Sequence, residues 1–160
     1  MPVRKSNKAS SKPQPAAAFA DLFAPVAEQI ELVRRQLTQR LTSRYDRVNS
    51  QIESIGAGQG KLFRAAVLLL SGKVIGSIRH DHIELAMMVE LVHTATLLHD
   101  DVIDQARTRR NQPTMNQLWG NTAAVLMGDF LLSRAFLAGA ELNLPRSGKI
   151  LSQTAEQICQ

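Results

Sequence analysis

Three aspartates stand close together in the segment LLHDDVID, and two arginines follow them in the segment TRR. At about 100° per residue of an α-helix, Asp101 and Asp104 lie about 100° and 40° around the axis from Asp100, which predicts one shared face. Neighbouring carboxylates repel one another unless a cation neutralises them. Oxygen ligands at this spacing suit Mg²⁺, which keeps several waters and is usually completed by substrate phosphates. Arg109 and Arg110 suit the same phosphates, because a guanidinium group binds phosphate oxygens through paired hydrogen bonds.

The helical face of the aspartates continues toward the amino terminus. His93 comes two turns before Asp100 and lies about 20° from its direction, and small or apolar side chains such as Ala86 and Thr96 fill the sector around it. The stripe is therefore acidic at one end and apolar at the other, as a site for a charged head group above an apolar tail requires. The plainer alternative is a helix with one buried face and a solvated acidic end.

A glycine-rich stretch, GAGQGKLFR, lies between two expected helices. It is not a phosphate-binding P-loop, because Ile55 stands where that motif needs glycine, Leu62 stands where it needs Ser or Thr, and no strand precedes it. The stretch instead predicts a turn that presents Lys61 and Arg64 on one face at the start of a helix. Two cations at a helix start suit an anion, although such cations are often simply solvated.

The composition favours an all-α fold. Hydrophobic residues make up 44% of the 160-residue chain and aromatic residues only 4%, so Leu, Ala, Val and Ile supply the core. Residues 1–15 are polar, basic and proline-containing, which predicts a disordered tail before one domain at 16–160. Apolar spacing predicts helices at 16–44, 47–55 and 62–78, a long central helix that carries the aspartates, a short helix to about 119, and helices at 121–142 and from 145.

Two other acidic residues have expected structural roles. Asp81 is placed to cap the long central helix. Asp129 lies in the middle of the apolar stretch TAAVLMGDFLLSRAFLAGAEL, so it is either functional or paired with a cation, for which Arg134 is a candidate.

The net charge of +5 is concentrated at the amino terminus, where Arg4, Lys5, Lys8 and Lys12 stand without an acid. No basic stripe with interleaved aromatic residues follows, so nucleic-acid binding is not expected. The single cysteine, Cys159, excludes an internal disulfide and agrees with a reducing compartment. No apolar run approaches the length of a membrane span and no signal-peptide core is present, so a cytoplasmic location is expected. The acid-free tail leaves an organelle transit peptide as the alternative.

Taken in order, five motifs resemble those of the trans-isoprenyl diphosphate synthases, or polyprenyl synthetase family, and within it the long-chain heptaprenyl, octaprenyl and solanesyl type. The motifs are GKxxR with Lys61 and Arg64, ELVH ending at His93, LLHDDVID, TRR, and VLMGDFLLSRAF around Asp129. The similarity extends from about residue 18 to the end and corresponds to the amino-terminal half of such an enzyme. The resemblance implies an all-α isoprenoid-synthase bundle and a prenyltransferase that condenses isopentenyl diphosphate with an allylic diphosphate.

The resemblance also implies a role for each matched residue. Asp100 and Asp104 would bind Mg²⁺ that bridges to the allylic diphosphate, and Asp101 would support them, so the three aspartates would be catalytic. Arg109 would contact the allylic diphosphate. The isopentenyl diphosphate would be bound by four residues: Lys61, Arg64, His93 and Arg110.

Product length is a further implication. In this family, bulky residues just before the first aspartate motif tend to close the product tunnel. Ala95 and Thr96 occupy the fifth and fourth positions before Asp100 and both are small, so a long product is expected. Met87 and Met88, deeper along the helix, are alternative floors for the tunnel.

The chain departs from the family pattern in two respects. Leu62 and Ala65 stand where the basic motif usually has arginine and proline. The second aspartate-rich motif, which completes the metal site, belongs beyond the last residue of this sequence. The resemblance therefore implies about half of a bundle, with apolar helix faces that a longer protein covers. A complete protein of this kind would form a homodimer or a heteromer.

Two other functions remain as alternatives. One is a metal-dependent phosphohydrolase of the HD type, because His93, His99, Asp100 and Asp104 include an adjacent His-Asp pair. That interpretation leaves the arginine pair unexplained, and imidazole ligands favour a transition metal over Mg²⁺. The other is a non-catalytic subunit that regulates a complete prenyl diphosphate synthase.

Overall fold

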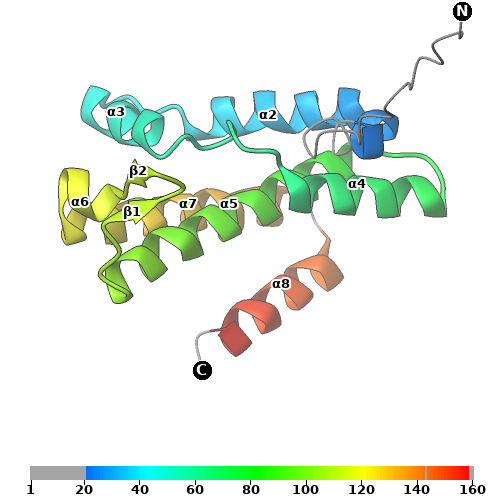
Figure 1. Ribbon diagram of the computed structural model, residues 1–160. Helices are drawn as coiled ribbons and strands as arrows, with labels where there is room; N and C mark the ends of the chain where they lie inside the picture. The colour runs from blue at the N-terminus through cyan, green and yellow to red at the C-terminus, as the bar shows by residue number, and fades with distance from the viewer. Residues whose placement is uncertain (1–20, 143, 159–160) are drawn as a thin grey trace, which may run out of the picture.

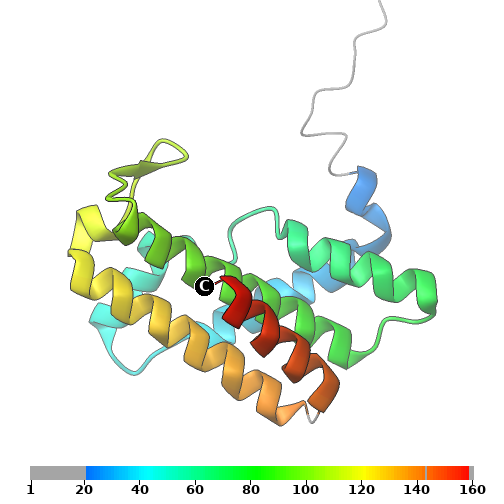
Figure 2. The same ribbon diagram turned by 90° about the horizontal axis from the view of Figure 1, so that it is seen from below.

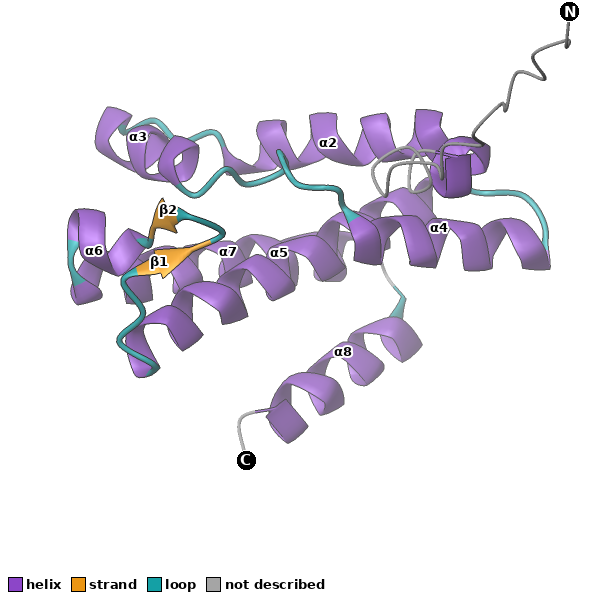
Figure 3. Cartoon of the chain, in the orientation of Figure 1, coloured by secondary structure: helices purple, strands orange, loops and turns teal. Residues whose placement is uncertain are grey.

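The computed structural model describes residues 21–142 and 144–158, and this part of the chain is almost entirely helical (Figure 3). Its elements follow in the order η1 (Ala24–Val26), α2 (Ala27–Leu41), α3 (Asp46–Ser54), α4 (Phe63–Ile75), α5 (His80–Ile103), β1 (Thr108–Arg109), β2 (Gln112–Pro113), α6 (Met115–Trp119), α7 (Asn121–Glu141) and α8 (Pro145–Ile158). The all-α prediction is confirmed. The expected tail at residues 1–15 and Cys159 lie outside the described residues.

The long helix α5 is the one around which the others pack. It lies between α4 on one side and α7 on the other; α2 crosses one face of this layer and α8 lies beneath the opposite face (Figure 1, Figure 2). Met87 and Ala95 of α5 are fully buried, and Leu91 is 1% exposed. Helix α5 is apolar on most of its sides and therefore buries side chains against several neighbouring helices, as expected of a core helix.

Two glycines allow α5 and α7 to approach closely. A Cβ atom added at Gly128 would lie 2.2 Å from Nε2 of His99, and one added at Gly139 would lie 2.8 Å from Cε of Met88. Any larger residue would have to displace its neighbour or push the helices apart. Small residues in α7 therefore permit the close packing of the two helices.

The ends of two helices differ from the sequence prediction. Helix α4 ends at Ile75 rather than at residue 78, and it begins after Leu62, whose backbone is left-handed (φ 47°). Asp81 does not cap α5, which begins one residue earlier, and the backbone N–H of Arg79 donates to Nδ1 of His82 at 2.9 Å. Asp81 instead lies in the first turn of α5, where the helix dipole favours a carboxylate.

A charged network connects three helices away from the aspartates. The guanidinium group of Arg40 in α2 lies 3.5 Å from the carboxylate of Glu84 in α5 and 2.6 Å from that of Glu141 in α7. Glu84 is only 5% exposed, so its charge depends on this cation for compensation. The network fixes α2 across the α5–α7 pair.

Helix α7 is long and apolar enough to cross a membrane by length and composition, and among the described helices only α7 meets this test. The expectation that no apolar run approaches the length of a membrane span is therefore wrong for this helix. About one third of its apolar window is buried inside the molecule. Core helices of water-soluble proteins meet the same test, and α7 packs along the whole of α5 (Figure 2).

Candidate functional site

The three aspartates at the end of α5 occupy two different environments. Asp101 is buried, with 4% of its surface exposed, whereas Asp100 and Asp104 are exposed. Helix α5 ends at Ile103 and Asp104 caps it, so Asp100 and Asp104 lie one turn apart at the carboxyl end of the helix. The prediction that the three carboxylates share one face is therefore wrong for Asp101, whose side chain is buried while the other two are exposed.

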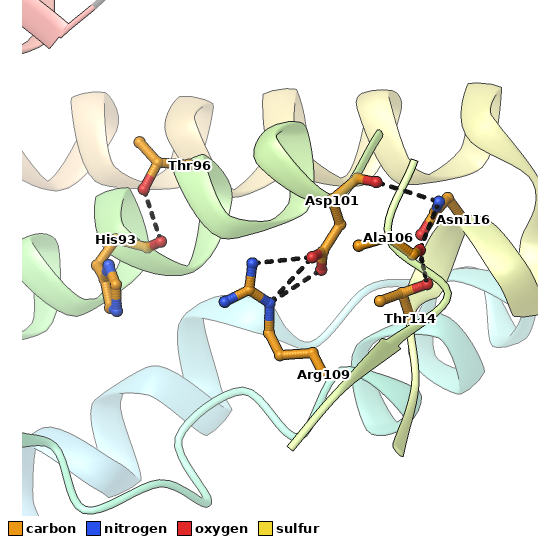
Figure 4. A network of polar contacts seen from close by, with 7 residues as sticks. All are labelled: His93, Thr96, Asp101, Ala106, Arg109, Thr114 and Asn116. Atoms are coloured by element: carbon orange, nitrogen blue, oxygen red, sulfur yellow. Dashed lines mark hydrogen bonds and ion pairs between the residues drawn. The ribbon is translucent and has the colours of Figure 1, made fainter. Parts of the chain in front are cut away.

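The loop after α5 is held in place by residues of the α6 segment. The Asn116 amide donates to the carbonyls of Asp101 and Ala106 at 3.2 and 3.1 Å, and the Thr114 hydroxyl donates to the Ala106 carbonyl at 2.7 Å (Figure 4). The Asp101 carbonyl also accepts a hydrogen bond from the backbone N–H of Ala106 at 2.9 Å, so these bonds together tie the loop that leaves α5 to the α6 segment. The sequence interpretation assigned no role to Thr114 or Asn116, although Asn and Thr are frequent at such positions.

The arginine pair lies in a short β-hairpin that the spacing of apolar residues did not predict. Strands β1 and β2 pair antiparallel, and the two residues between them, Arg110 and Asn111, both have positive φ (50° and 63°). These values correspond to a two-residue hairpin turn of type I′, for which Asn-Gly is the usual signal. Arginine in this conformation is uncommon and is often associated with function. Its presence at the tip of the hairpin places Arg110 beyond Arg109.

Arg109 extends from the hairpin to the buried aspartate. Its Nε and Nη2 atoms donate to Oδ1 of Asp101 at 3.0 and 2.8 Å, and Nε also lies 3.2 Å from Oδ2 (Figure 4). Hydrogen bonding to Asp101 raises the pKa of Arg109. Among the described residues, Nη1 of Arg109 makes no hydrogen bond, so this nitrogen is available for a phosphate oxygen. Asp101 thus positions Arg109 next to Asp100.

The second set of cations stands where α4 begins. Leu62 buries its side chain while its left-handed backbone turns the chain into α4, which leaves Lys61 and Arg64 exposed on either side of it. The backbone N–H of Ala65 donates to Oε1 of Glu90, a buried residue of α5, at 3.0 Å. An internal carboxylate therefore already occupies the amino-terminal end of α4. An external anion would bind here through Lys61 and Arg64 themselves.

His93 lies between the two sets of cations. It is half-buried on the side of α5 that also faces Arg109 (Figure 4). Burial and repulsion by Arg64 lower the pKa of His93, Glu90 partly opposes this effect, and Arg110 and Arg109 lower the pKa further. The arginine charges that act on His93 thus come from α4 and from the hairpin, which are far apart in sequence. Lys61 is not among them.

Helix α5 also fits a divalent cation at its end. Within the described part of the chain, no group of three or more His, Cys, Asp or Glu side chains converges on one point. Two exposed carboxylates, Asp100 and Asp104, remain one turn apart at the negative end of the α5 dipole. Two carboxylates that leave the other positions to water and phosphate oxygens are the kind of site that Mg²⁺ uses.

Comparison with known proteins agrees with this geometry. Residues 46–160 match the sequence model of the polyprenyl synthetase family. The chain belongs to this family. The family resemblance seen in the sequence motifs is thereby confirmed.

The similar proteins include synthases of long prenyl chains. The chain is 38% identical over 117 residues to an all-trans-nonaprenyl-diphosphate synthase (geranyl-diphosphate specific) of Rhodobacter capsulatus, covering 72% of this chain and 36% of that protein. It is 34% identical over 142 residues to heptaprenyl diphosphate synthase component 2 of Bacillus subtilis, covering 88% of this chain and 40% of that protein. This member of the polyprenyl synthetase family therefore spans about two fifths of the length of the relatives that it matches.

A solved structure has the same arrangement of helices. The polyprenyl synthase of Caulobacter crescentus, crystallised with calcium and isoprenyl diphosphate, superposes with a TM-score of 0.83 at 31% sequence identity, covering 92% of this chain and 45% of that one. The described helices are therefore those of the isoprenoid-synthase fold, as the sequence resemblance implied.

The contact between α5 and α7 bears on two expectations, the pairing of Asp129 with Arg134 and the HD phosphohydrolase alternative. Asp129 is not paired with Arg134: its Oδ1 lies 3.5 Å from Nε2 of His99, and the Arg134 guanidinium lies over the ring of Phe130, 5.0 Å from its centre. Nε2 of His99 also lies 3.2 Å from the carbonyl oxygen of Val125. His99 is therefore directed at α7 and away from Asp100, so the HD phosphohydrolase alternative has no supporting metal cluster among the described residues.

Proposed function

We propose that this chain carries the substrate-binding half of a prenyltransferase that condenses isopentenyl diphosphate with an allylic diphosphate. The observation that carries the proposal is the convergence on His93 of arginines from α4 and from the hairpin, next to the exposed carboxylates of Asp100 and Asp104. Cations alone would suit many anions. Cations beside a two-carboxylate metal site suit a diphosphate whose charge is shared between metal and arginines.

In the proposed reaction, the bond between the allylic carbon and its diphosphate oxygen breaks, and the departing diphosphate gains negative charge. Arg109 faces that charge with its Nη1 edge while Asp101 holds the other edge of the guanidinium group. A positioned cation stabilises developing charge without reorganising during the reaction. Asp100 and Asp104 would hold Mg²⁺, which would supply further stabilisation of the same charge.

The isopentenyl diphosphate is assigned to the other side of His93, where Lys61, Arg64 and Arg110 supply positive charge. Its double bond attacks the allylic cation and forms the new carbon–carbon bond, and the carbocation that results then loses a proton, which restores a double bond. Because burial and neighbouring arginines lower the pKa of His93, the free site holds this side chain neutral at pH 7. A bound diphosphate reverses that balance and favours the imidazolium form, which adds one more cation to the site.

A long product is the proposed outcome. Ala95 is fully buried and Thr96 donates its hydroxyl to the His93 carbonyl at 2.8 Å, so neither presents a bulky group below the aspartates. Further down α5, Met88 packs against Gly139 and lines a groove of about 330 Å³ between α7 and α8. Met88 is thus the nearest candidate for a floor.

A second candidate function is that of a subunit in a heteromeric synthase. It is favoured by the similarity to a protein named as component 2 of a heptaprenyl diphosphate synthase. In that case the same diphosphate site would bind substrates, and a partner would supply the remaining metal ligands.

Prenyl transfer is tested with the purified 160-residue chain, labelled isopentenyl diphosphate, a panel of allylic diphosphates and Mg²⁺, with Asp100→Ala as control. Metal-dependent elongation that the control lacks supports a complete catalyst, and the product length identifies the enzyme. If calorimetry detects Mg²⁺-dependent diphosphate binding but the chain shows no turnover, the result supports the subunit function. Absence of both overturns the proposal.

A further inference from the structure

The glycine-rich segment between α3 and α4 ends directly before Lys61, and we refer to residues 56–60 as the glycine loop (Figure 1). Gly56 and Gly58 have positive φ (59° and 80°), a backbone conformation that favours glycine. Within these five residues one backbone hydrogen bond forms, from the N–H of Gln59 to the carbonyl of Gly56 at 2.9 Å. A loop with so little internal bonding does not fix its own shape, so the position of Lys61 depends on contacts with other elements.

Arg34 of α2 supplies such a contact, because its guanidinium group binds two carbonyls of the glycine loop. Nη1 donates to the carbonyl of Gly58 and lies 3.5 Å from the carbonyl oxygen of Gly60, and Nη2 lies 3.4 Å from the same Gly60 oxygen. Nε of the guanidinium group donates to Oε1 of Glu31 at 3.3 Å, which orients its opposite edge toward the loop. One planar group therefore connects two carbonyls, and the second of them directly precedes Lys61.

Helix α2 is a fixed support for this contact. Val33 is fully buried and Leu37 is 2% exposed, so the turns on both sides of Arg34 are anchored in the core. A Cβ atom added at Gly58 would lie 3.5 Å from Leu37, so the loop backbone also touches α2 directly. A hollow of about 440 Å³ lies between α2, α3 and the loop, with Ile52 in its lining. Because the loop spans a hollow there, the guanidinium group provides support that packing does not.

The direction of the Gly60 carbonyl also determines the direction of the N–H group that follows it. A trans peptide group is planar, so its C=O and N–H bonds point in opposite directions. No peptide bond among the described residues is cis. Because the Gly60 carbonyl is directed at Arg34 on α2, the N–H of Lys61 is directed away from α2. Arg34 thereby orients the peptide group from which the Lys61 side chain begins.

We propose that Arg34 is a positioning residue, which holds the carbonyls of Gly58 and Gly60 and so directs Lys61 toward the diphosphate of isopentenyl diphosphate. The inference rests on the proposed function and adds to it a residue of α2 that does not itself touch the substrate. Arg34 acts through the geometry of its fork, because the guanidinium edge that would bind an anion already faces the loop carbonyls.

The first test is calorimetry of isopentenyl diphosphate binding without Mg²⁺, which isolates the cations from the metal site. Arg34→Ala should weaken binding about tenfold, and Arg34→Lys should weaken it nearly as much, because an ammonium group keeps the charge but not the planar fork. Arg35→Ala is the matched control, since Arg35 is the next residue of α2 and is exposed, and it should bind normally. Equal losses in Arg34→Ala and Arg35→Ala, or full binding by Arg34→Lys, would indicate general electrostatic attraction and overturn the proposal.

A double-mutant cycle tests whether Arg34 acts through Lys61. In a Lys61→Ala background, Arg34→Ala should cause no further loss of isopentenyl diphosphate binding. Additive losses would show that Arg34 acts independently of Lys61 and would overturn the proposal.

Amide hydrogen exchange of the substrate-free chain provides a readout that does not depend on the proposed function. In Arg34→Ala, residues 56–61 should exchange about tenfold faster while α2 and α5 exchange as in the unmodified chain. Unchanged exchange in the loop, or faster exchange along the whole of α2, would overturn the proposal. Geranyl diphosphate with Mg²⁺ should bind Arg34→Ala normally, because its site is at the other end of α5. If the unmodified chain binds neither diphosphate, the proposed function itself fails, whereas normal binding by Arg34→Ala refutes only the role of Arg34.

Discussion

Arg109 donates two hydrogen bonds to one oxygen of Asp101, from Nε at 3.0 Å and from Nη2 at 2.8 Å, across only eight residues of chain. The pair joins the end of α5 to the hairpin. It also separates the three aspartates by function, since Asp101 is directed into the protein while Asp100 and Asp104 face outward. The motif therefore combines one structural carboxylate with two that are available to a metal.

Substitution of the three aspartates by asparagine should separate these roles. Asp101→Asn removes the charge that Arg109 faces and should lower the free energy of unfolding by about 1–2 kcal/mol, since Arg109 is partly solvent-screened. Asp100→Asn and Asp104→Asn should leave stability unchanged or slightly higher, because they relieve repulsion, but should weaken Mg²⁺ binding at least tenfold. Urea unfolding and metal titration measure the two effects. Equal stability loss in all three variants would contradict the division.

The hairpin offers a matched pair of arginines for a binding test. Arg110 lowers the pKa of His93. Arg107, which is exposed in the same loop, is not among the residues that shift this pKa. Arg110→Ala should weaken isopentenyl diphosphate binding about 10- to 100-fold, the effect of losing about 1.5–3 kcal/mol of charge-assisted hydrogen bonding. Arg107→Ala should bind normally. Calorimetry of both variants decides the matter, and an equal loss in the two would point to general electrostatic attraction.

His93 should make stability and binding depend on pH. Its folded-state pKa lies below the reference value of 6.5, so the unfolded chain takes up a proton that the folded chain resists. The free energy of unfolding should therefore fall as the pH drops through about 6.5 toward the folded-state pKa, and His93→Asn should reduce this slope. Diphosphate binding should raise the pKa, which NMR titration of the imidazole detects. A pKa that bound diphosphate leaves unchanged would remove His93 from the site.

The close approach of α5 and α7 predicts a double-mutant effect. Gly128→Ala places a methyl group against His99 and should destabilise the protein by about 1–3 kcal/mol, despite the higher helix propensity of alanine. In a His99→Ala background the same substitution should be neutral or stabilising, because the clash is gone. Thermal unfolding of the four proteins gives the coupling energy. Additive effects would show that the two residues do not touch in solution.

The helices themselves follow from apolar spacing. Ile30, Val33, Leu37 and Leu41 recur at intervals of three or four residues and are all buried in α2, as the 3.6-residue period requires. Helix boundaries were less accurate because they depend on local geometry that spacing does not encode. Examples are the left-handed backbone at Leu62 and the start of α5 at His80, before the expected cap at Asp81.

The sequence motifs named candidate residues for the site, but they did not reveal the contacts that position these residues. Helical angles placed Asp101 about 100° from Asp100, which is far enough for one to be buried and the other exposed, but only the hairpin determines which. That hairpin has Arg-Asn at its turn in place of the usual Asn-Gly, so the sequence contains no local pattern that predicts it. The bond from Ala65 to Glu90 joins helices 25 residues apart, and no local pattern reveals such a contact.

This last contact has a consequence for how the site forms as the chain folds. The Asp101–Arg109 pair closes a segment of eight residues, whereas the Ala65–Glu90 bond closes one of 25. The longer closure costs about 1 kcal/mol more in chain entropy. The aspartates and the hairpin arginines can therefore assemble early from local contacts, while Lys61 and Arg64 join them only when α4 docks on α5. We therefore expect the allylic side of the proposed site to form before the isopentenyl side is complete.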